Sequence, residues 1–169
     1  GVVEEQRHEL NKLKAEQKER YLDLDRRLSQ AITSEPSKTS AASGKAKESY
    51  TVAFKLMKAQ KLTEAAEAFN LFLKEHPKSS YAVNGYYWLG QIYYNQAKLD
   101  EARKAFTIVV NQYPEHQKTA DSMYKLGVVL HRLGDDDQGK QYLQLVVKQF
   151  SDSAPARFAR KYLKENFNK

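Results

Sequence analysis

Hydrophobic side chains recur at heptad spacing through residues 1–32, among charged residues of both signs. The spacing of three or four residues, with one place where two fours follow each other, is typical of a coiled coil with a local stutter. One copy alone would leave the seam leucines in water, so the pattern predicts a helix that self-associates. A single solvated helix is the alternative. The predicted oligomerisation residues are Leu10, Leu13, Gln17, Tyr21, Leu24 and Leu28.

The next stretch, residues 33–47, contains no large apolar side chain. It is rich in Ser, Ala, Thr and Lys and includes Pro36 and Gly44. Such a segment cannot bury enough surface to offset the entropy lost on ordering, so we predict a flexible linker.

Residues 48–169 repeat their side-chain types, as Tyr50, Tyr87 and Tyr124 show at intervals of 37 positions. Each repeat contains a helical run, a short break and a second helical run, which predicts stacked helix–turn–helix units. The whole chain is therefore expected to be all-α, with this part forming a superhelix. The predicted units cover about 46–82, 83–119 and 120–153, followed by a capping helix at 154–167.

Polar residues in the breaks predict where the second helices begin and end. Thr63, Asp100 and Asp137 lie at equivalent positions and are expected to cap the free amide groups of these helices. Pro77 and Pro114 are expected to end them, because the residue before a proline disfavours helical geometry.

Composition supports a helical protein and removes several classes of function. Only four prolines and seven glycines occur in 169 residues, and cysteine is absent. The lack of cysteine excludes a disulfide framework, a thiol nucleophile and cysteine-based zinc sites. No apolar run approaches the roughly 18–20 residues that a membrane helix needs, so we expect no membrane span.

The chain has a net charge of +7, and basic residues cluster only near its end. The last thirteen residues contain Arg157, Arg160, Lys161, Lys164 and Lys169 against a single glutamate. Because the excess is otherwise spread out, we expect no nucleic-acid partner. The alternative is that the basic terminal helix binds nucleic acid or another anionic surface.

Signals of catalysis and metal binding are weak. His131 has no second histidine or carboxylate at ligand spacing beside it, and the run Asp135–Asp137 lacks the alternating calcium pattern. The chain also lacks a glycine-rich phosphate loop and a Gly-x-Ser-x-Gly turn. We therefore predict no catalytic residue, no metal and no cofactor, and a protein that is not an enzyme.

The second repeat matches a known motif. Tyr87-Trp88-Leu89-Gly90-x-x-Tyr93, then Asp100-Glu101-Ala102-x-x-Ala105-Phe106, then Tyr113-Pro114, resembles the tetratricopeptide repeat. The order of the parts is similar to the YbgF/CpoB family, as are the run RYLDLDRRL at 20–28 and the run NGYYWLGQ at 84–91.

This resemblance implies a periplasmic accessory protein of the Tol-Pal system whose signal peptide has been removed. It implies a trimer formed through the coiled coil, with TolA as the partner. A bifunctional peptidoglycan synthase and its lipoprotein activator are further implied partners. The implied role is to coordinate septal wall synthesis with outer-membrane constriction during cell division. The alternative is a generic envelope-assembly scaffold with a different client.

Stacked repeats of this type curve, and the first helix of each unit lines the concave face. Tyrosines at these positions offer large contact area on few rotatable bonds, which suits a peptide or helix ligand. The alternative is that the tyrosines pack between helices, as we expect for Tyr86, Trp88, Tyr93 and Phe106. The predicted groove residues are Tyr50, Phe54, Met57, Asn84, Tyr87, Gln91, Tyr94, Asn95, Tyr124, Val128, His131 and Arg132.

Overall fold

The computed structural model describes residues 4, 5, 7, 8, 11, 12, 15, 19 and 40–168. Its regular elements in these residues are all helices, which confirms the all-α prediction. The chain divides into two compact units, Gly1–Ser43 and Gly44–Lys169. In residues 40–168 the helices are α2 (Ser40–Lys58), α3 (Leu62–Glu75), α4 (Ala82–Asn95), α5 (Leu99–Gln112), α6 (Thr119–Arg132), α7 (Asp136–Gln149) and α8 (Ala154–Phe167).

The described residues of the first unit up to Glu19 are helical, and their side chains are exposed. Their exposure agrees with the charged outer positions of the predicted coiled-coil helix. The seam residues Leu10, Leu13, Gln17, Tyr21, Leu24 and Leu28 lie outside the described residues. Self-association through this seam therefore stays a prediction.

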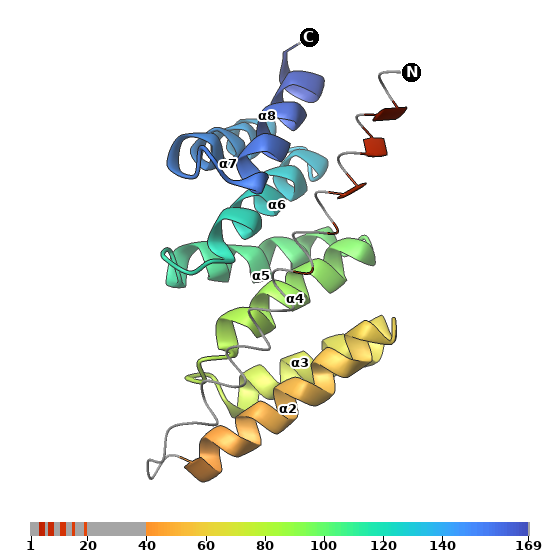
Figure 1. The fold of residues 1–169 in the computed structure, drawn as a ribbon, viewed down its shortest axis with the longest axis vertical. Helices are drawn as coiled ribbons and strands as arrows, with labels where there is room; N and C mark the ends of the chain where they lie inside the picture. Colours follow the sequence, from red (N-terminus) through yellow and green to blue (C-terminus); the bar gives the residue numbers. More distant parts are fainter. Residues whose placement is uncertain are drawn as a thin grey trace. The chain divides into compact units, whose positions relative to one another are not determined.

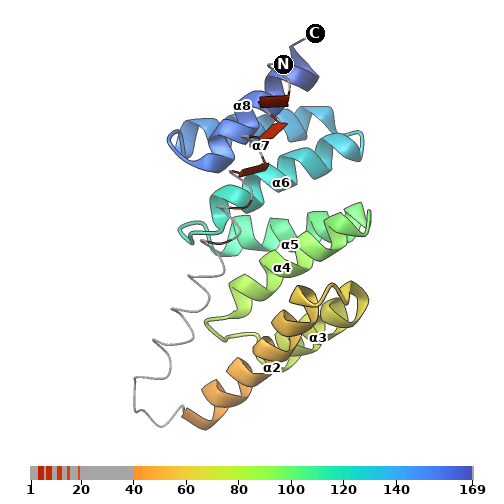
Figure 2. The same cartoon turned by 45° about the vertical axis from the view of Figure 1, so that its right-hand side comes forward.

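Helices α2 to α8 form a stack of helical pairs (Figures 1 and 2). The ring of Tyr50 in α2 packs against Phe69 and Phe72 of α3, with centroids 5.8 and 5.6 Å apart. From α3 onward each helix packs against the next one along the chain, and α6 also packs against α8. The pairs α2–α3, α4–α5 and α6–α7 correspond to the three repeats, and α8 follows them.

Helix α2 begins earlier than the sequence suggested. Residues 40–47, assigned to the flexible linker 33–47, form the first turns of α2. Three alanines, which favour helix most strongly, lie in this stretch, and one of them, Ala46, is buried. The absence of large apolar residues was therefore a poor guide here, because small residues also bury well at close helix contacts.

The turn inside each pair uses one backbone conformation. Gln60, Ala97 and Gly134 have positive φ angles of 62°, 58° and 92°. In each turn the next amide donates back to a carbonyl five residues earlier, as Lys98 N–H does to the Tyr93 oxygen at 2.9 Å. This is the Schellman arrangement, which satisfies the free carbonyls at a helix end. Only the third turn has the glycine that this conformation favours.

The predicted caps are two residues too late in the chain. Thr63, Asp100 and Asp137 lie inside the first turns of α3, α5 and α7, so they are not the capping residues. Among the residues before these helices, Asp135 caps with its side chain, and its Oδ1 accepts from the Gln138 amide at 3.2 Å. The left-handed residue ends the preceding helix tightly, and the next helix starts two residues after it.

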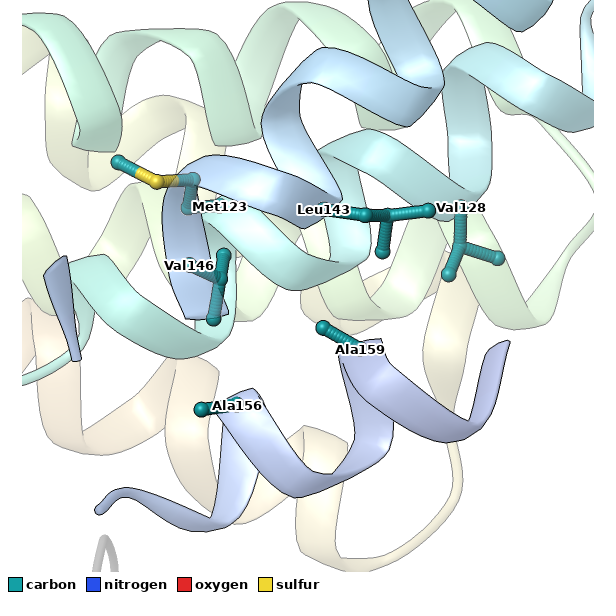
Figure 3. Packing of buried hydrophobic residues seen from close by; sticks show 6 residues of the cluster. All are labelled: Met123, Val128, Leu143, Val146, Ala156 and Ala159. Carbon is teal, nitrogen blue, oxygen red and sulfur yellow. The ribbon is translucent and has the colours of Figure 1, made fainter. Parts of the chain in front are cut away.

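Small residues let the two helices of a pair approach closely. A Cβ atom added to Gly90 would lie 2.6 Å from the Phe106 ring, and one on Gly139 would lie 2.8 Å from the Gly127 carbonyl oxygen. Beside this contact, α6, α7 and α8 enclose a buried cluster (Figure 3). Its members are Met123, Val128, Leu143, Val146, Ala156 and Ala159.

Candidate functional site

The twelve predicted groove residues lie on α2, α4 and α6, the first helices of the three pairs. The structure separates them by exposure. Asn95 and Arg132 are exposed, and Phe54, Gln91, Tyr94, Tyr124 and His131 are partly exposed. The remaining five are buried, so they present little surface to a ligand in this structure. These five are Tyr50, Met57, Asn84, Tyr87 and Val128.

Tyr50 shows why a repeated tyrosine need not face solvent. Its ring stacks on Tyr81 at 4.9 Å, and its hydroxyl accepts a hydrogen bond from Trp88 Nε1 at 3.1 Å. A buried tyrosine needs such a polar partner for its hydroxyl. Packing between helices, the alternative for this column, therefore describes Tyr50. Of the four aromatics assigned to the core, Trp88 and Phe106 are buried, whereas Tyr86 and Tyr93 are partly exposed.

A buried polar network joins α4 to the start of α6. The Tyr87 hydroxyl donates to Asp121 Oδ2 at 2.6 Å, and Lys118 Nζ donates to Asn84 Oδ1 at 2.9 Å. The Lys118 ammonium also lies 5.4 Å from the centroid of the Tyr87 ring. Lys118 is only 2% exposed, and burying its charge requires such partners. Sequence reasoning missed this residue, since a loop lysine carries no signal of burial.

Several of the accessible predicted residues belong to an aromatic and basic surface over α4 and α6, which α8 extends. At its centre, the Tyr94 ring lies 5.2 Å from Arg132 Cζ and 5.9 Å from Lys125 Nζ. We call these three residues, together with Tyr124, His131 and Tyr162, the aromatic-basic surface. Lys125 and Tyr162 were not predicted, and Tyr162 belongs to α8, which the sequence suggested only as a cap.

Ring contacts with α8 hold the aromatic-basic surface in place. The Tyr124 ring packs against Phe158 at 5.8 Å, and the His131 ring lies 4.7 Å from Phe167 and 5.7 Å from Tyr162. His131 Nδ1 also lies 2.7 Å from Asp136 Oδ1. Helix α8 therefore positions this surface as well as ending the stack.

Two tyrosine hydroxyl groups of this surface have raised pKa values, mainly because they are buried. Burial, followed by the neighbouring Tyr94 and Asp121, raises the pKa of Tyr124 well above its ordinary value of 10.0. Burial and Tyr94 also raise the pKa of Tyr162. Both hydroxyls can therefore donate hydrogen bonds to an acceptor on a bound partner.

The described part of the chain shows neither a metal-binding cluster nor a membrane-spanning helix. Residues 40–168 and the described N-terminal positions contain no group of three His, Asp or Glu side chains placed to hold a metal ion. Among these same residues, no helix is both long and apolar enough to cross a membrane.

Comparison with known families supports the repeat assignment. The tetratricopeptide repeat family matches residues 53–79, 85–116 and 121–153. This chain belongs to the tetratricopeptide repeat family. The N-terminal domain of stress-induced protein-1 (STI-1) from C. elegans has the same fold, with a TM-score of 0.58 and 13% identity. The structural match covers 70% of this chain and 94% of the C. elegans domain.

Two proteins of Pseudomonas putida, one from strain KT2440, are more closely similar in sequence. Both are named cell division coordinator CpoB and are 34% identical to this chain over 120 residues. The match covers 54% of this chain and 45% of each relative, so the chain spans a little under half their length. The similarity confirms the resemblance to the CpoB family.

Proposed function

We propose that this chain is a periplasmic protein-interaction module that binds TolA and coordinates septal peptidoglycan synthesis with outer-membrane constriction. The observation that carries the proposal is the aromatic-basic surface, with partly exposed rings that other side chains already hold in place. The name of the Pseudomonas putida relatives supports the role in cell division.

The aromatic-basic surface has the properties of a protein-binding site. Tyrosine and arginine are enriched in the residues that contribute most to binding, and rings with few rotatable bonds lose little entropy. Tyr94 is flanked by Lys125 and Arg132, so its orientation is largely set before a partner arrives. Beside it on α4, Gln91 Nε2 donates to Asn95 Oδ1 at 3.2 Å, which leaves further amide groups for a ligand backbone.

Self-association would strengthen this binding. If residues 1–32 form the proposed trimeric coiled coil, three copies of the repeat domain share one assembly. Once one copy binds a membrane-anchored partner, the others bind at a high effective concentration. A bifunctional peptidoglycan synthase and its lipoprotein activator are the further partners we propose, on the strength of the family resemblance.

A second candidate is an envelope-assembly scaffold with another client. The likeness to a C. elegans domain of only 13% identity shows the fold alone and does not favour TolA over another ligand. Sequences that differ this much share a repeat architecture without sharing a ligand.

Calorimetric titration of the full chain with the helical periplasmic region of TolA tests the proposal. Saturable binding that is weakened roughly tenfold or more by Tyr94→Ala with Tyr124→Ala would support both the partner and the site. Leu71→Ala is the matched control, because Leu71 is an exposed apolar residue on α3, outside this surface. Circular dichroism must first show that the variants keep their helical content.

Two results would contradict parts of the proposal. Binding that survives the double substitution would keep TolA and place its site elsewhere on the chain. The absence of binding by the unsubstituted chain would remove TolA and favour the scaffold with another client.

A further inference from the structure

The aromatic-basic surface has a charge preference that narrows the kind of segment it binds. We propose that it binds an acidic segment of a partner protein, with two carboxylates about 10 Å apart on either side of an apolar residue. The inference rests on the proposed protein-binding function and specifies the chemistry of the ligand. It does not depend on which protein carries the segment.

Two cations on α6 carry the argument. Lys125 and Arg132 are seven residues apart, so they lie on the same side of α6, and both approach the ring of Tyr94. An aromatic face attracts a cation weakly and leaves its outer N–H groups available to other acceptors. The ring therefore orients both cations without neutralising them.

The carboxylates near these cations already have other partners. Asp121 accepts from the Tyr87 hydroxyl, Asp136 pairs with His131 at 2.7 Å, and Glu165 lies 3.8 Å from Lys161 Nζ. Across residues 40–168, the ion pairs involve neither Lys125 nor Arg132. Neither Lys125 nor Arg132 is in an ion pair with these carboxylates, so the outer N–H groups of both cations can pair with carboxylates of a ligand.

The spacing of the cations predicts the spacing in the ligand. Seven residues at about 1.5 Å rise place the two Cα atoms roughly 10 Å apart. Carboxylates seven residues apart on a ligand helix, or three apart on an extended strand, match this distance. The ring of Tyr94 approaches both cations, and its exposed part can contact an apolar side chain between the two acids.

The tyrosine hydroxyls favour the same ligand. Tyr124 and Tyr162 are partly exposed, and their hydroxyl groups remain protonated donors at neutral pH. Carboxylates accept such hydrogen bonds, whereas lysine and arginine side chains on a partner have only donors. A basic segment would be repelled by the two cations.

Titration of the full-length chain, followed by the NMR signals of its backbone amides, tests this inference. The probe is an alanine-based helical peptide with two glutamates seven residues apart and a leucine between them. The comparison peptide has lysines at the two glutamate positions. We expect the acidic peptide to bind and to shift the amide signals around Tyr94, Tyr124 and Arg132. Raising NaCl from about 50 to 500 mM should weaken this binding, since salt screens exposed charges.

Charge reversal provides the decisive variant. Lys125→Glu with Arg132→Glu should weaken binding of the acidic peptide roughly tenfold and reverse the preference toward the lysine peptide. The matched control is Arg157→Glu with Lys164→Glu, which changes the net charge equally on exposed residues of α8. This control should change the affinity for the acidic peptide by no more than about threefold, because its charges act only at long range and are largely screened by salt. Lys125→Met with Arg132→Met removes the charge without repulsion and serves if the reversal variant fails to fold.

Several outcomes would overturn the inference: no binding of the acidic peptide, equal binding of both peptides, or equal loss in the variant and its control. Binding of a single-stranded oligonucleotide at least as tight as that of the acidic peptide would also overturn it, in favour of a general polyanion site. Failure of TolA to bind, with the acidic peptide still binding, would remove the proposed partner and leave this inference intact. If TolA binds and charge reversal does not change its affinity, TolA stays the proposed partner and the inference of an acidic ligand is overturned.

Discussion

Gly139 illustrates how single residues set the distance between helices in this chain. It lies on α7 opposite α6, where an added Cβ would be 2.8 Å from the Gly127 carbonyl oxygen and 2.9 Å from the His131 backbone nitrogen. Backbone atoms cannot rotate away as a side chain can. Ala65 and Ala102 stand at the equivalent positions of the first two repeats, 74 and 37 residues earlier. An alanine is too large at Gly139, where α6 and α7 pack more closely than it would permit.

Gly139→Ala should accordingly destabilise the folded chain by about 1–3 kcal/mol, the usual cost of overpacking. The control is Gly44→Ala on α2, where an added Cβ meets nothing within 4 Å. This change should be neutral or stabilise by up to about 1 kcal/mol, because alanine favours helix. Urea unfolding followed by circular dichroism measures both values, and equal effects would contradict the close approach of α6 and α7.

Tyr124 should make stability depend on pH in the alkaline range. Burial raises its pKa in the folded chain above 10.0, so the unfolded chain loses this proton first as the pH rises. Its contribution is therefore fully present below about pH 10 and is lost as pH rises toward the folded-state pKa. The unfolding free energy of the Tyr124→Phe variant should therefore fall less steeply above pH 10 than that of the unsubstituted chain. The two slopes should differ by less than about 1.4 kcal/mol per pH unit, because the ring is only partly buried.

Unfolding free energies measured by urea titration from pH 8 to 11 test this expectation. Below pH 10 the two chains should show the same pH dependence, which serves as the internal control. Parallel curves above pH 10 would show that Tyr124 titrates alike in both states.

At the scale of elements, the tight turn within each pair decides where the second helix starts. Asp135 precedes α7 and caps it, whereas Asp137 lies in its first turn. Asp135→Ala should therefore cost about 0.5–2 kcal/mol, as for other lost caps. Asp137→Ala should cost at most about 1 kcal/mol, from its weaker interaction with the helix dipole. Thermal unfolding compares the two, and a larger loss for Asp137→Ala would restore the assignment made from sequence.

The turn between α4 and α5 contains an unfavourable residue. Ala97 has a φ angle of 58°, a conformation that costs an L-residue about 1–2 kcal/mol and costs glycine very little. Replacing Ala97 by glycine would remove this cost, but part of the gain in stability is offset by the greater freedom of glycine in the unfolded chain. Ala97→Gly should therefore stabilise the chain by about 0.5–1 kcal/mol in urea unfolding. A loss of stability would show that the turn is not left-handed at Ala97.

At the scale of the whole molecule, the start of α2 sets the boundary of the repeat domain. A fragment of residues 40–169 contains all of α2, whereas one of residues 48–169 begins where the sequence placed the end of the linker. The shorter fragment lacks buried Ala46 and the Lys47 carbonyl that accepts from Thr51 Oγ1 at 2.7 Å. Its unfolding temperature should be lower by several degrees, since about 1 kcal/mol corresponds to roughly 3–6 °C in a domain of this size. Equal midpoints in calorimetry would return residues 40–47 to the linker.

Much of this architecture follows from the sequence alone. The recurrence of Tyr50, Tyr87 and Tyr124 predicted three helical pairs, because a helix–turn–helix unit buries its apolar face only against a neighbouring copy. Helical periodicity, the small residues at close contacts and the tetratricopeptide motif were likewise readable, since they depend on residues near one another in the chain. The burial of Trp88 and Phe106 was predictable for the same reason.

Only the tertiary structure decided what each repeated position does. Tyr50 packs on Tyr81, Tyr87 donates to Asp121, and Tyr124 packs on Phe158. The three tyrosines occupy the same position in their repeats, yet their neighbours come from different helices and differ in size and charge. The burial of Lys118 and the placement of Lys125 and Arg132 over Tyr94 arise in the same way. Periodicity identifies the face of a helix, but the exposure and charge of that face depend on side chains that distant segments bring to it.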